Sequence, residues 1–124
     1  MLPQEAIYTK GDTINQEYQL FLNKCTNQYW DLTNFAIRYE LTNGTVTIKK
    51  ATANVVGGSS SQIEITDAIH GIFIVKIPAS ESADLTIGDY DFEIEVTSLI
   101  GEKTTVGRGK IRIVDEIITW TDED

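Results

Sequence analysis

Apolar and polar residues alternate along most of this chain with the period of two expected of a β-strand that has one buried face. The i, i+3, i+4 spacing of a surface helix is almost absent. One long strand is predicted over 14–22, with Leu22 on its inner face, after an extended piece at 7–9 and a turn at 10–13. The pattern therefore predicts an all-β chain.

A second strand is predicted over 35–41, and Asn43-Gly44 follows it directly. Asn-Gly is the strongest short hairpin signal, because both central residues of a type I′ turn have a positive φ. A two-residue loop fixes the cross-strand pairs, which are Thr42 with Thr45, Leu41 with Val46 and Tyr39 with Ile48. This register places the apolar residues of both strands on one face.

The rest of the chain continues in short alternating stretches separated by turn residues. The expected elements are strands at 63–66 and 73–77 (ended by Pro78), a helical turn within 79–85, a strand at 90–96, and a last strand interrupted at 107–109. Residues 56–62 are rich in Gly and Ser and predict a flexible loop. Seven or eight short strands without helical crossovers predict an immunoglobulin-like antiparallel β-sandwich.

Length and composition fit one folded domain. The 124 residues are 41% hydrophobic and 23% charged, which argues against disorder, collagen and coiled coil. We predict a single domain over 1–124 with short arms at about 1–6 and 115–124.

The charge balance excludes a simple nucleic-acid binder. Ten Lys and Arg residues against nineteen Asp and Glu give a formal net charge of -9, which repels a phosphate backbone. The nearest thing to a basic patch is Arg108, Lys110 and Arg112, and acidic residues on the preceding strand are expected to neutralise it, namely Asp91, Glu93 and Glu95.

Cys25 is the only cysteine, so no intramolecular disulfide is possible, as suits assembly in a reducing cytoplasm. The first residues lack the basic start and apolar run of a signal peptide, and no segment is long enough for a membrane-spanning helix. We therefore expect neither secretion nor membrane insertion.

No catalytic, cofactor-binding or metal-binding set is predicted. Asp91, Glu93 and Glu95 fit a solvated strand face better than a Ca²⁺ site, which would need carbonyl ligands and a tight loop. His70 is the only histidine, which excludes a metal site of several imidazoles and, with one cysteine, the structural zinc patterns. Ser59 to Ser61, Asp67 and His70 could nominally form a hydrolase triad, but they lack a nucleophile motif. Residues 107–110 fit a bulge better than a phosphate loop.

The termini carry the candidate contacts with partner proteins. Residues 115–120 combine acidic residues with Ile117, Ile118 and Trp120, and they fit an extension of the last core strand and a docking segment about equally well. Leu2 and Pro3 are the matching candidates near the N-terminus. Trp30 is expected to close one end of the core.

Four short motifs together resemble a known family. They are Tyr8-Thr9-Lys10-Gly11-Asp12-Thr13, Trp30-Asp31-Leu32-Thr33-Asn34-Phe35, Gly71-Ile72-Phe73-Ile74-Val75 and Ile87-Gly88-Asp89-Tyr90-Asp91-Phe92-Glu93. Spread over most of the chain, they resemble the N-terminal immunoglobulin-like domain of the baseplate upper protein family from phages of Gram-positive bacteria, and related small virion proteins. Members of that family continue into a stalk or receptor-binding region, whereas this sequence ends soon after the sandwich.

The resemblance implies a non-enzymatic bacteriophage virion structural protein, assembled in the host cytoplasm as a tail, baseplate, neck or capsid-decoration subunit. Its implied partners are other virion proteins and copies of itself, with no nucleic acid, membrane, small-molecule substrate or cofactor. The alternative is a small carbohydrate-binding or adhesion module of Ig-like fold that presents aromatic residues to a sugar, with Tyr29 and Trp30 as candidates.

Overall fold

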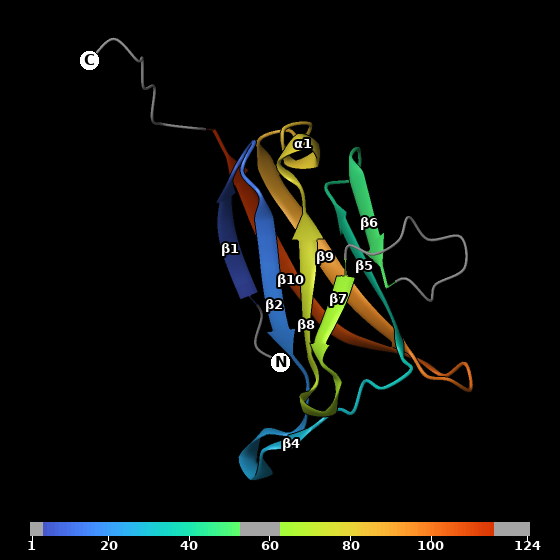
Figure 1. Ribbon diagram of the computed structural model, residues 1–124. Helices are drawn as coiled ribbons and strands as arrows, with labels where there is room; N and C mark the ends of the chain where they lie inside the picture. The colour runs from blue at the N-terminus through green and yellow to red at the C-terminus, as the bar shows by residue number, and fades with distance from the viewer. Residues whose placement is uncertain (1–3, 53–62, 116–124) are drawn as a thin grey trace.

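A computed structural model describes residues 4–52 and 63–115 of the chain, which fold into two large β-sheets packed face to face (Figure 1). The five-stranded sheet has the order β1 (Gln4–Thr9), β10 (Lys103–Val114), β9 (Gly88–Thr97), β5 (Ala36–Thr42) and β6 (Thr47–Ala51). The three-stranded sheet has the order β2 (Ile14–Gln19), β8 (Ile72–Ile77) and β7 (Ile63–Asp67). The predicted all-β class is confirmed.

The small elements lie between these strands. A short hairpin of β3 (Phe21–Asn23) and β4 (Gln28–Tyr29) holds the 3₁₀ turn η1 (Lys24–Thr26), and a second turn, η2 (Ala68–His70), joins β7 to β8. The predicted helical turn is α1 (Ala79–Ser82), which follows Pro78 at the end of β8. The hairpin, η2 and the β9–β10 turn share one end of the molecule, called the lower end from here on, and α1 lies at the upper end (Figure 1).

The prediction of purely antiparallel sheets is wrong for one pair of strands. β1 runs parallel to β10, from Gln4 opposite Gly109 to Thr9 opposite Val114, whereas β2 pairs antiparallel with β8. The turn at 10–13 therefore carries the chain from one sheet to the other. β1 begins at Gln4, so it takes up part of the N-terminal arm expected at 1–6.

One core lies between the two sheets. Tyr18 of the three-stranded sheet contacts Phe92 of the five-stranded sheet, with ring centroids 5.9 Å apart, and Phe92 stacks on Tyr39 at 5.7 Å. Burying an aliphatic or aromatic side chain of this size stabilises a fold by about 1.5–3 kcal/mol. The fully buried large side chains are Tyr39, Tyr90, Phe73, Ile14, Leu32, Ile37, Leu41, Ile77, Leu85, Ile94, Ile111 and Ile113.

The predicted long strand through Leu22 is wrong. β2 ends at Gln19, and the Leu22 side chain is 66% exposed on β3. The Leu20 amide still donates to the Gly71 carbonyl at 3.0 Å, in register with β8, but the Leu20 carbonyl accepts from the Trp30 amide at 3.0 Å and the Gly71 amide donates to the Ala68 carbonyl at 3.1 Å. Competing backbone hydrogen bonds thus end the strand although its alternation continues.

The predicted register of the β5–β6 hairpin is also wrong, by two residues. Thr42 lies opposite Thr47 and Leu41 opposite Ile48, so the loop has four residues rather than two. Gly44 has a positive φ of 93°, but Asn43 does not; its Oδ1 instead accepts hydrogen bonds from the amides of Thr45 and Val46. Because side chains alternate with a period of two, a two-residue shift keeps every side chain on its predicted face.

The connection from β8 to β9 ties the upper end together. The Gly11 amide donates to Ser82 Oγ at 3.0 Å, and Lys50 Nζ of β6 contacts both carboxylate oxygens of Glu81, at 2.6 and 2.7 Å. Tyr90 Oη accepts from the Thr86 amide at 2.9 Å and donates to the Thr86 carbonyl at 3.0 Å. The predicted irregularity near 107–109 is a register shift between Thr105 and Gly107 within β10.

Candidate interaction site

The partner contacts predicted from the sequence lie outside the described residues. These are Leu2, Pro3, Ile117, Ile118 and Trp120, and the Gly-Ser loop at 56–62 lies outside as well. The described chain shows where the terminal segments attach. Gln4 and Val114, from which they continue, lie at opposite ends of the parallel β1–β10 pair.

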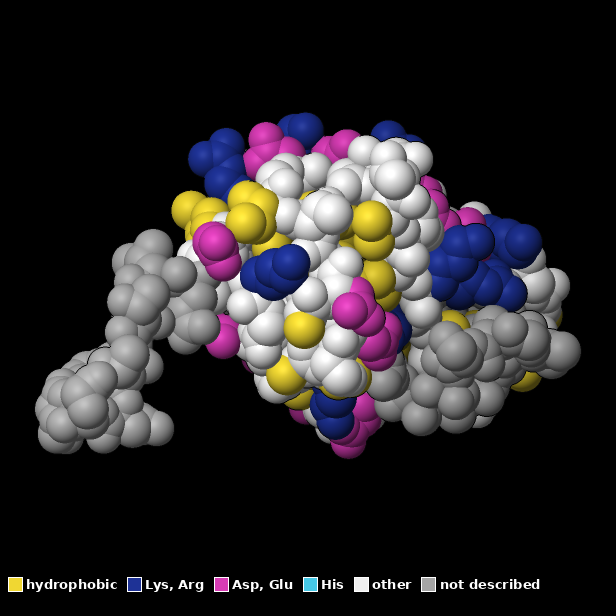
Figure 2. All heavy atoms as spheres, turned by 90° about the horizontal axis from the view of Figure 1, so that it is seen from above, with side chains coloured by type: hydrophobic (Ala, Val, Ile, Leu, Met, Phe, Trp, Pro, Cys, Tyr) yellow, Lys and Arg dark blue, Asp and Glu magenta, His cyan; other side chains and the backbone are white. Residues whose placement is uncertain are grey.

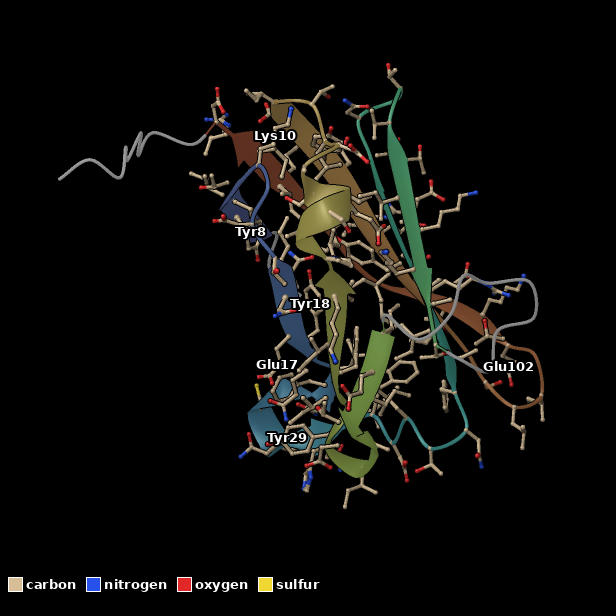
Figure 3. The ribbon with its side chains drawn as sticks, turned by 45° about the horizontal axis from the view of Figure 1, so that its top comes forward. Tyr8, Lys10, Glu17, Tyr18, Tyr29 and Glu102 are labelled. Atoms are coloured by element: carbon tan, nitrogen blue, oxygen red, sulfur yellow. The ribbon has the colours of Figure 1, made fainter. Side chains whose placement is uncertain are left out.

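The lower end carries most of the exposed aliphatic side chains of the described residues. Leu99 and Ile100, at the tip of the β9–β10 hairpin, are 80% and 81% exposed, and Leu22 and Ile69 project from the two other connections at this end. The hairpin tip stands out from the body (Figure 1), and Glu102 marks it in Figure 3, well apart from Tyr29 of the β3–β4 hairpin. Adjacent exposed aliphatic residues at a tip are a candidate contact for another protein.

The sequence interpretation did not single out Leu99 and Ile100. The available signal was their position: they follow the alternating residues of β9 and directly precede the turn at Gly101-Glu102. Apolar residues inside a turn find no inner face of the sheet to pack on. That signal identifies exposure, although it does not identify a partner.

A tight backbone crossing holds the lower end in place. Gly71 has a φ of 67°, and a Cβ atom at this position would lie 2.7 Å from the Leu20 carbonyl oxygen and 3.0 Å from that of Trp30. The Leu32 amide donates to the Ala68 carbonyl at 2.8 Å beside it. β2, β4 and the turn into β8 therefore meet at a point where only glycine fits.

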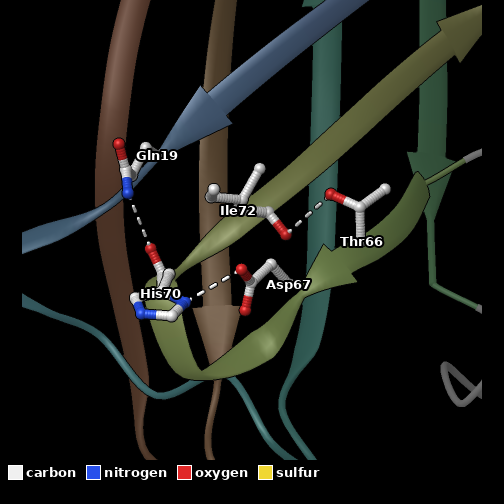
Figure 4. Close-up of polar contacts among 5 residues, drawn as sticks. All are labelled: Gln19, Thr66, Asp67, His70 and Ile72. Carbon is white, nitrogen blue, oxygen red and sulfur yellow. Dashed lines mark hydrogen bonds and ion pairs between the residues drawn. The ribbon is translucent and has the colours of Figure 1, made fainter.

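The η2 turn brings together two members of the nominal triad (Figure 4). His70 Nδ1 lies 2.9 Å from Asp67 Oδ2, and the His70 carbonyl accepts a hydrogen bond from Gln19 Nε2 at 3.1 Å. Both side chains of the Asp–His pair are about half exposed, and Ser59 to Ser61 lie outside the described residues. The contact orients the imidazole ring, and the structure describes two of the three members of the nominal triad.

Tyr29 and Trp30 do not form a shared platform for a sugar. Tyr29 packs between Phe21, at 5.0 Å between ring centroids, and His70, at 5.5 Å. Trp30 instead makes an edge contact with Phe35 at 6.0 Å and packs on the core, which confirms its predicted place at one end of the core.

Cys25 is exposed in η1.

Rows of ion pairs cover the outer face of the five-stranded sheet. Arg108 pairs with Glu93 at 2.9 Å, Lys110 with Asp91 at 3.0 Å, and Arg112 with Asp89 at 2.9 Å. The predicted neutralisation is confirmed, except that Glu95 pairs with Arg38 of β5 instead. Figure 2, seen from above, shows basic and acidic side chains alternating along the upper edge of the view. Among the described residues no group of three His, Cys, Asp or Glu side chains is arranged to hold a metal ion.

A polar cluster lies inside the core. Tyr39 Oη donates to Gln16 Oε1 at 2.8 Å, whereas Tyr18 Oη has no hydrogen-bond partner among the described residues. Burial raises the pKa of both phenols well above 10, and the neighbouring Tyr8, labelled with Tyr18 in Figure 3, contributes to the rise. These groups therefore stay neutral, which suits a structural role.

No family model matches this chain, and a search of curated proteins found no match. In the described part of the chain, no helix has the length and apolar character needed to cross a bilayer.

Proposed function

We propose that this chain is a non-enzymatic bacteriophage virion structural protein, a tail, baseplate, neck or capsid-decoration subunit that acts through protein–protein contacts. The observation that carries the proposal is the pair of aliphatic side chains at the β9–β10 tip, Leu99 and Ile100, which are more than three-quarters exposed. Water-exposed aliphatic pairs are unfavourable in an isolated molecule and become favourable when a neighbouring protein covers them. The resemblance of the sequence motifs to virion proteins supplies the biological setting, with assembly in the host cytoplasm.

The proposal includes an Ig-like sandwich as the scaffold. An Ig domain places strands B, E and D in one sheet and G, F, C and C′ in the other. The orders β2-β8-β7 and β10-β9-β5-β6 correspond to these sets in chain order. Tyr90, near the start of β9, supports this assignment, since its hydroxyl bonds to the backbone of Thr86 upstream of the strand, as in the tyrosine corner of Ig domains.

The surface chemistry suits a contact protein better than an enzyme. The ion-paired outer face is charged but locally balanced, and exposed pairs of this kind contribute little to stability or binding. Most of the exposed aliphatic groups instead lie in or next to the connections between strands, where a neighbouring subunit can meet them, and Ile7 of β1 is the exception among the described residues. The contacts proposed are with other virion proteins and with copies of this chain.

The first test is the native mass in solution, by light scattering, of the full chain and of a chain that ends after Val114. A defined oligomer of the full 13.8 kDa chain that the truncation reduces to a monomer supports contacts through Ile117, Ile118 and Trp120. The double variant Leu99→Ser, Ile100→Thr tests the hairpin tip, with Ile87→Thr, an exposed isoleucine before β9, as its control.

The competing function is an Ig-like carbohydrate-binding or adhesion module. Tyr29 and Trp30 contact different neighbours, so the aromatic pair that this function would use does not form a shared platform. Screening the monomer against a glycan array decides between the two. Binding of a glycan that Tyr29→Ala abolishes, by a protein that never associates, would contradict the virion proposal.

A further inference from the structure

The free side of β1 is an open edge of the five-stranded sheet. In the described part of the chain β1 pairs with β10 alone, in an unbroken register from Gln4 to Thr9. An edge strand presents unpaired backbone N–H and C=O groups that can bond to another strand. Ile7, in the middle of β1, is 63% exposed beside this edge.

The other sheet edges carry features that discourage pairing. β6 holds two lysines, and the Lys50 side chain, only 4% exposed, points into the molecule and pairs with Glu81. Inward-pointing charges and lysines on an edge oppose the addition of a strand. β7 contains a register shift between Ile65 and Asp67, and the outward side chains of β2 are all polar, namely Asn15, Glu17 and Gln19. β1 carries one charged residue, Glu5, but it is the edge with an exposed apolar side chain, no lysine and no register shift.

The chain itself contains a segment suited to this edge. Residues 117–120 read Ile-Ile-Thr-Trp, and β-branched and aromatic residues of this kind favour strands. The segment follows Val114, which lies opposite Thr9 at the end of β1 and accepts a hydrogen bond from the Lys10 amide at 2.9 Å. The chain thus continues from the end of β10, beside the end of β1, toward a segment of strand-forming residues.

The segment cannot readily reach its own edge. β10 lies on one side of β1, and a strand added to the open edge would lie on the other. The added strand would therefore be two strand spacings from β10, or about 9.6 Å. The three steps from Val114 to Ile117 span about 10 Å even when fully extended. A segment of this length covers the straight distance only. It is too short to pass around the turn at Lys10 as well, whose amide is hydrogen-bonded to the end of β10. A neighbouring copy, in contrast, can offer its edge without this constraint.

We propose that the open edge of β1 receives residues 117–120 of another copy of this chain as an added strand, with Ile7 packing against one of its apolar side chains. This inference rests on the proposed function, since it names a second copy as one partner of the virion subunit. Each copy has one edge to offer and one segment to give, so pairs or longer series can form. Backbone hydrogen bonds hold the added strand, and the apolar side chains select it.

Light scattering on single variants tests the edge and the segment separately. We expect Ile7→Lys, which places a charge on the edge, and a chain ending after Asp115 each to lose the oligomer and give the monomer mass. Ile87→Lys adds the same charge to a comparably exposed isoleucine, 55% against 63% for Ile7, which precedes β9 and is separated from β1 by β10, and it should keep the oligomer. A far-ultraviolet circular dichroism spectrum verifies that each variant is folded.

Disulfide trapping then identifies the contact. In a Cys25→Ser background, chains carrying Ile7→Cys are mixed with chains carrying a cysteine at 117, 118, 119 or 120. Because successive side chains of a strand point to opposite faces, we expect a cross-link between chains at alternate positions only. The absence of any cross-link between the mixed chains would overturn the proposal. A chain that carries both cysteines and closes the disulfide within itself would overturn it as well.

The outcomes separate this inference from the proposed function. An oligomer that survives both Ile7→Lys and the truncation contradicts the β1 contact but leaves a self-assembling virion subunit in place. A full chain that is monomeric at every concentration also contradicts the β1 contact. If that monomer binds a glycan in the array, the proposed function fails as well.

Discussion

At the scale of single residues, Tyr18 and Tyr39 offer a matched pair of buried phenols in one core. Tyr39→Phe leaves Gln16 Oε1 without its donor, and we expect it to lower the free energy of unfolding by about 1–3 kcal/mol. Tyr18→Phe removes a hydroxyl that has no partner in the described structure, so its expected effect is neutral or stabilising by up to about 1 kcal/mol. Urea unfolding of the two variants compares them, and an equal loss in both would contradict the assigned hydrogen bonds.

The same two tyrosines predict sensitivity to alkaline pH. Their pKa values are raised in the folded state, mainly by burial, above the ordinary value of 10.0. Their contribution to stability is complete below pH 10. Above it, the unfolded chain loses phenolic protons that the folded chain keeps, and stability falls by about 1.4 kcal/mol per pH unit for each residue. Unfolding midpoints from pH 8 upward should therefore drop less steeply in Tyr18→Phe and Tyr39→Phe, and least in the double variant; an unchanged slope would contradict this.

Gly71 gives the third residue-scale prediction. Gly71→Ala adds a Cβ that meets two backbone oxygens, at 2.7 and 3.0 Å, in addition to the strain of a positive φ. We expect a loss of about 3–5 kcal/mol in unfolding free energy. Gly44→Ala is the control, since its φ is 93° with no atom within 4 Å of the added Cβ, and it should cost about 1–2 kcal/mol. Similar losses at both sites, measured by thermal unfolding, would show that the crossing at Leu20 can relax.

At the scale of elements, the Lys50–Glu81 pair joins an edge strand to the helical turn of another connection. Glu81→Gln weakens the partner of a buried ammonium group, and we expect a loss of about 1–3 kcal/mol. Lys50→Met keeps the buried stem and removes the charge, so it should cost less than Glu81→Gln.

Lys50→Met should also make the protein aggregate more readily, because it removes the inward-pointing charge that protects the edge of β6. Turbidity during storage measures this. Lys49→Met is the matched control, since it removes a lysine from the exposed face of the same strand. Equal aggregation of the two variants would mean that the direction of Lys50 does not matter.

The elements themselves could largely be predicted from the alternation of side chains, while their ends and partners could not. The strand over 90–96 is part of β9 and the one before Pro78 is β8, because period-two burial is a local property. β2 ends at Gln19 because the Leu20 carbonyl and the Gly71 amide do not bond to each other: the first accepts from the Trp30 amide and the second donates to the Ala68 carbonyl. The four-residue β5–β6 loop likewise depends on side-chain hydrogen bonds of Asn43 that compete with the turn geometry its sequence favours.

At the scale of the whole molecule, the packing of two sheets around one core follows from the pattern, but the candidate site does not. The charge rows of β9 and β10 were recognisable because neighbouring strands in the chain pair with each other. The parallel pairing of β1 with β10 joins the two ends of the chain, and no local pattern encodes it. The exposed edge of β1 therefore could be recognised only from the folded chain. The same is true of the features that protect the edges of β6, β7 and β2.

The net charge of -9 makes a final prediction about association. Copies of this chain repel one another at neutral pH, and salt screens that repulsion, with a Debye length of about 10 Å at 0.1 M and about 3 Å at 1 M. A contact made of backbone hydrogen bonds and apolar side chains is itself little affected by sodium chloride. We therefore expect the oligomeric fraction, measured by light scattering, to rise with sodium chloride.

Glu102→Lys, at the exposed β9–β10 turn, makes the net charge less negative by two and should reach the same oligomeric fraction at lower salt. If salt instead dissolves the oligomer, the copies are held by ion pairs between chains. The rows on the outer face of the five-stranded sheet would then be the surface to examine, because their paired charges could exchange partners with a neighbouring copy.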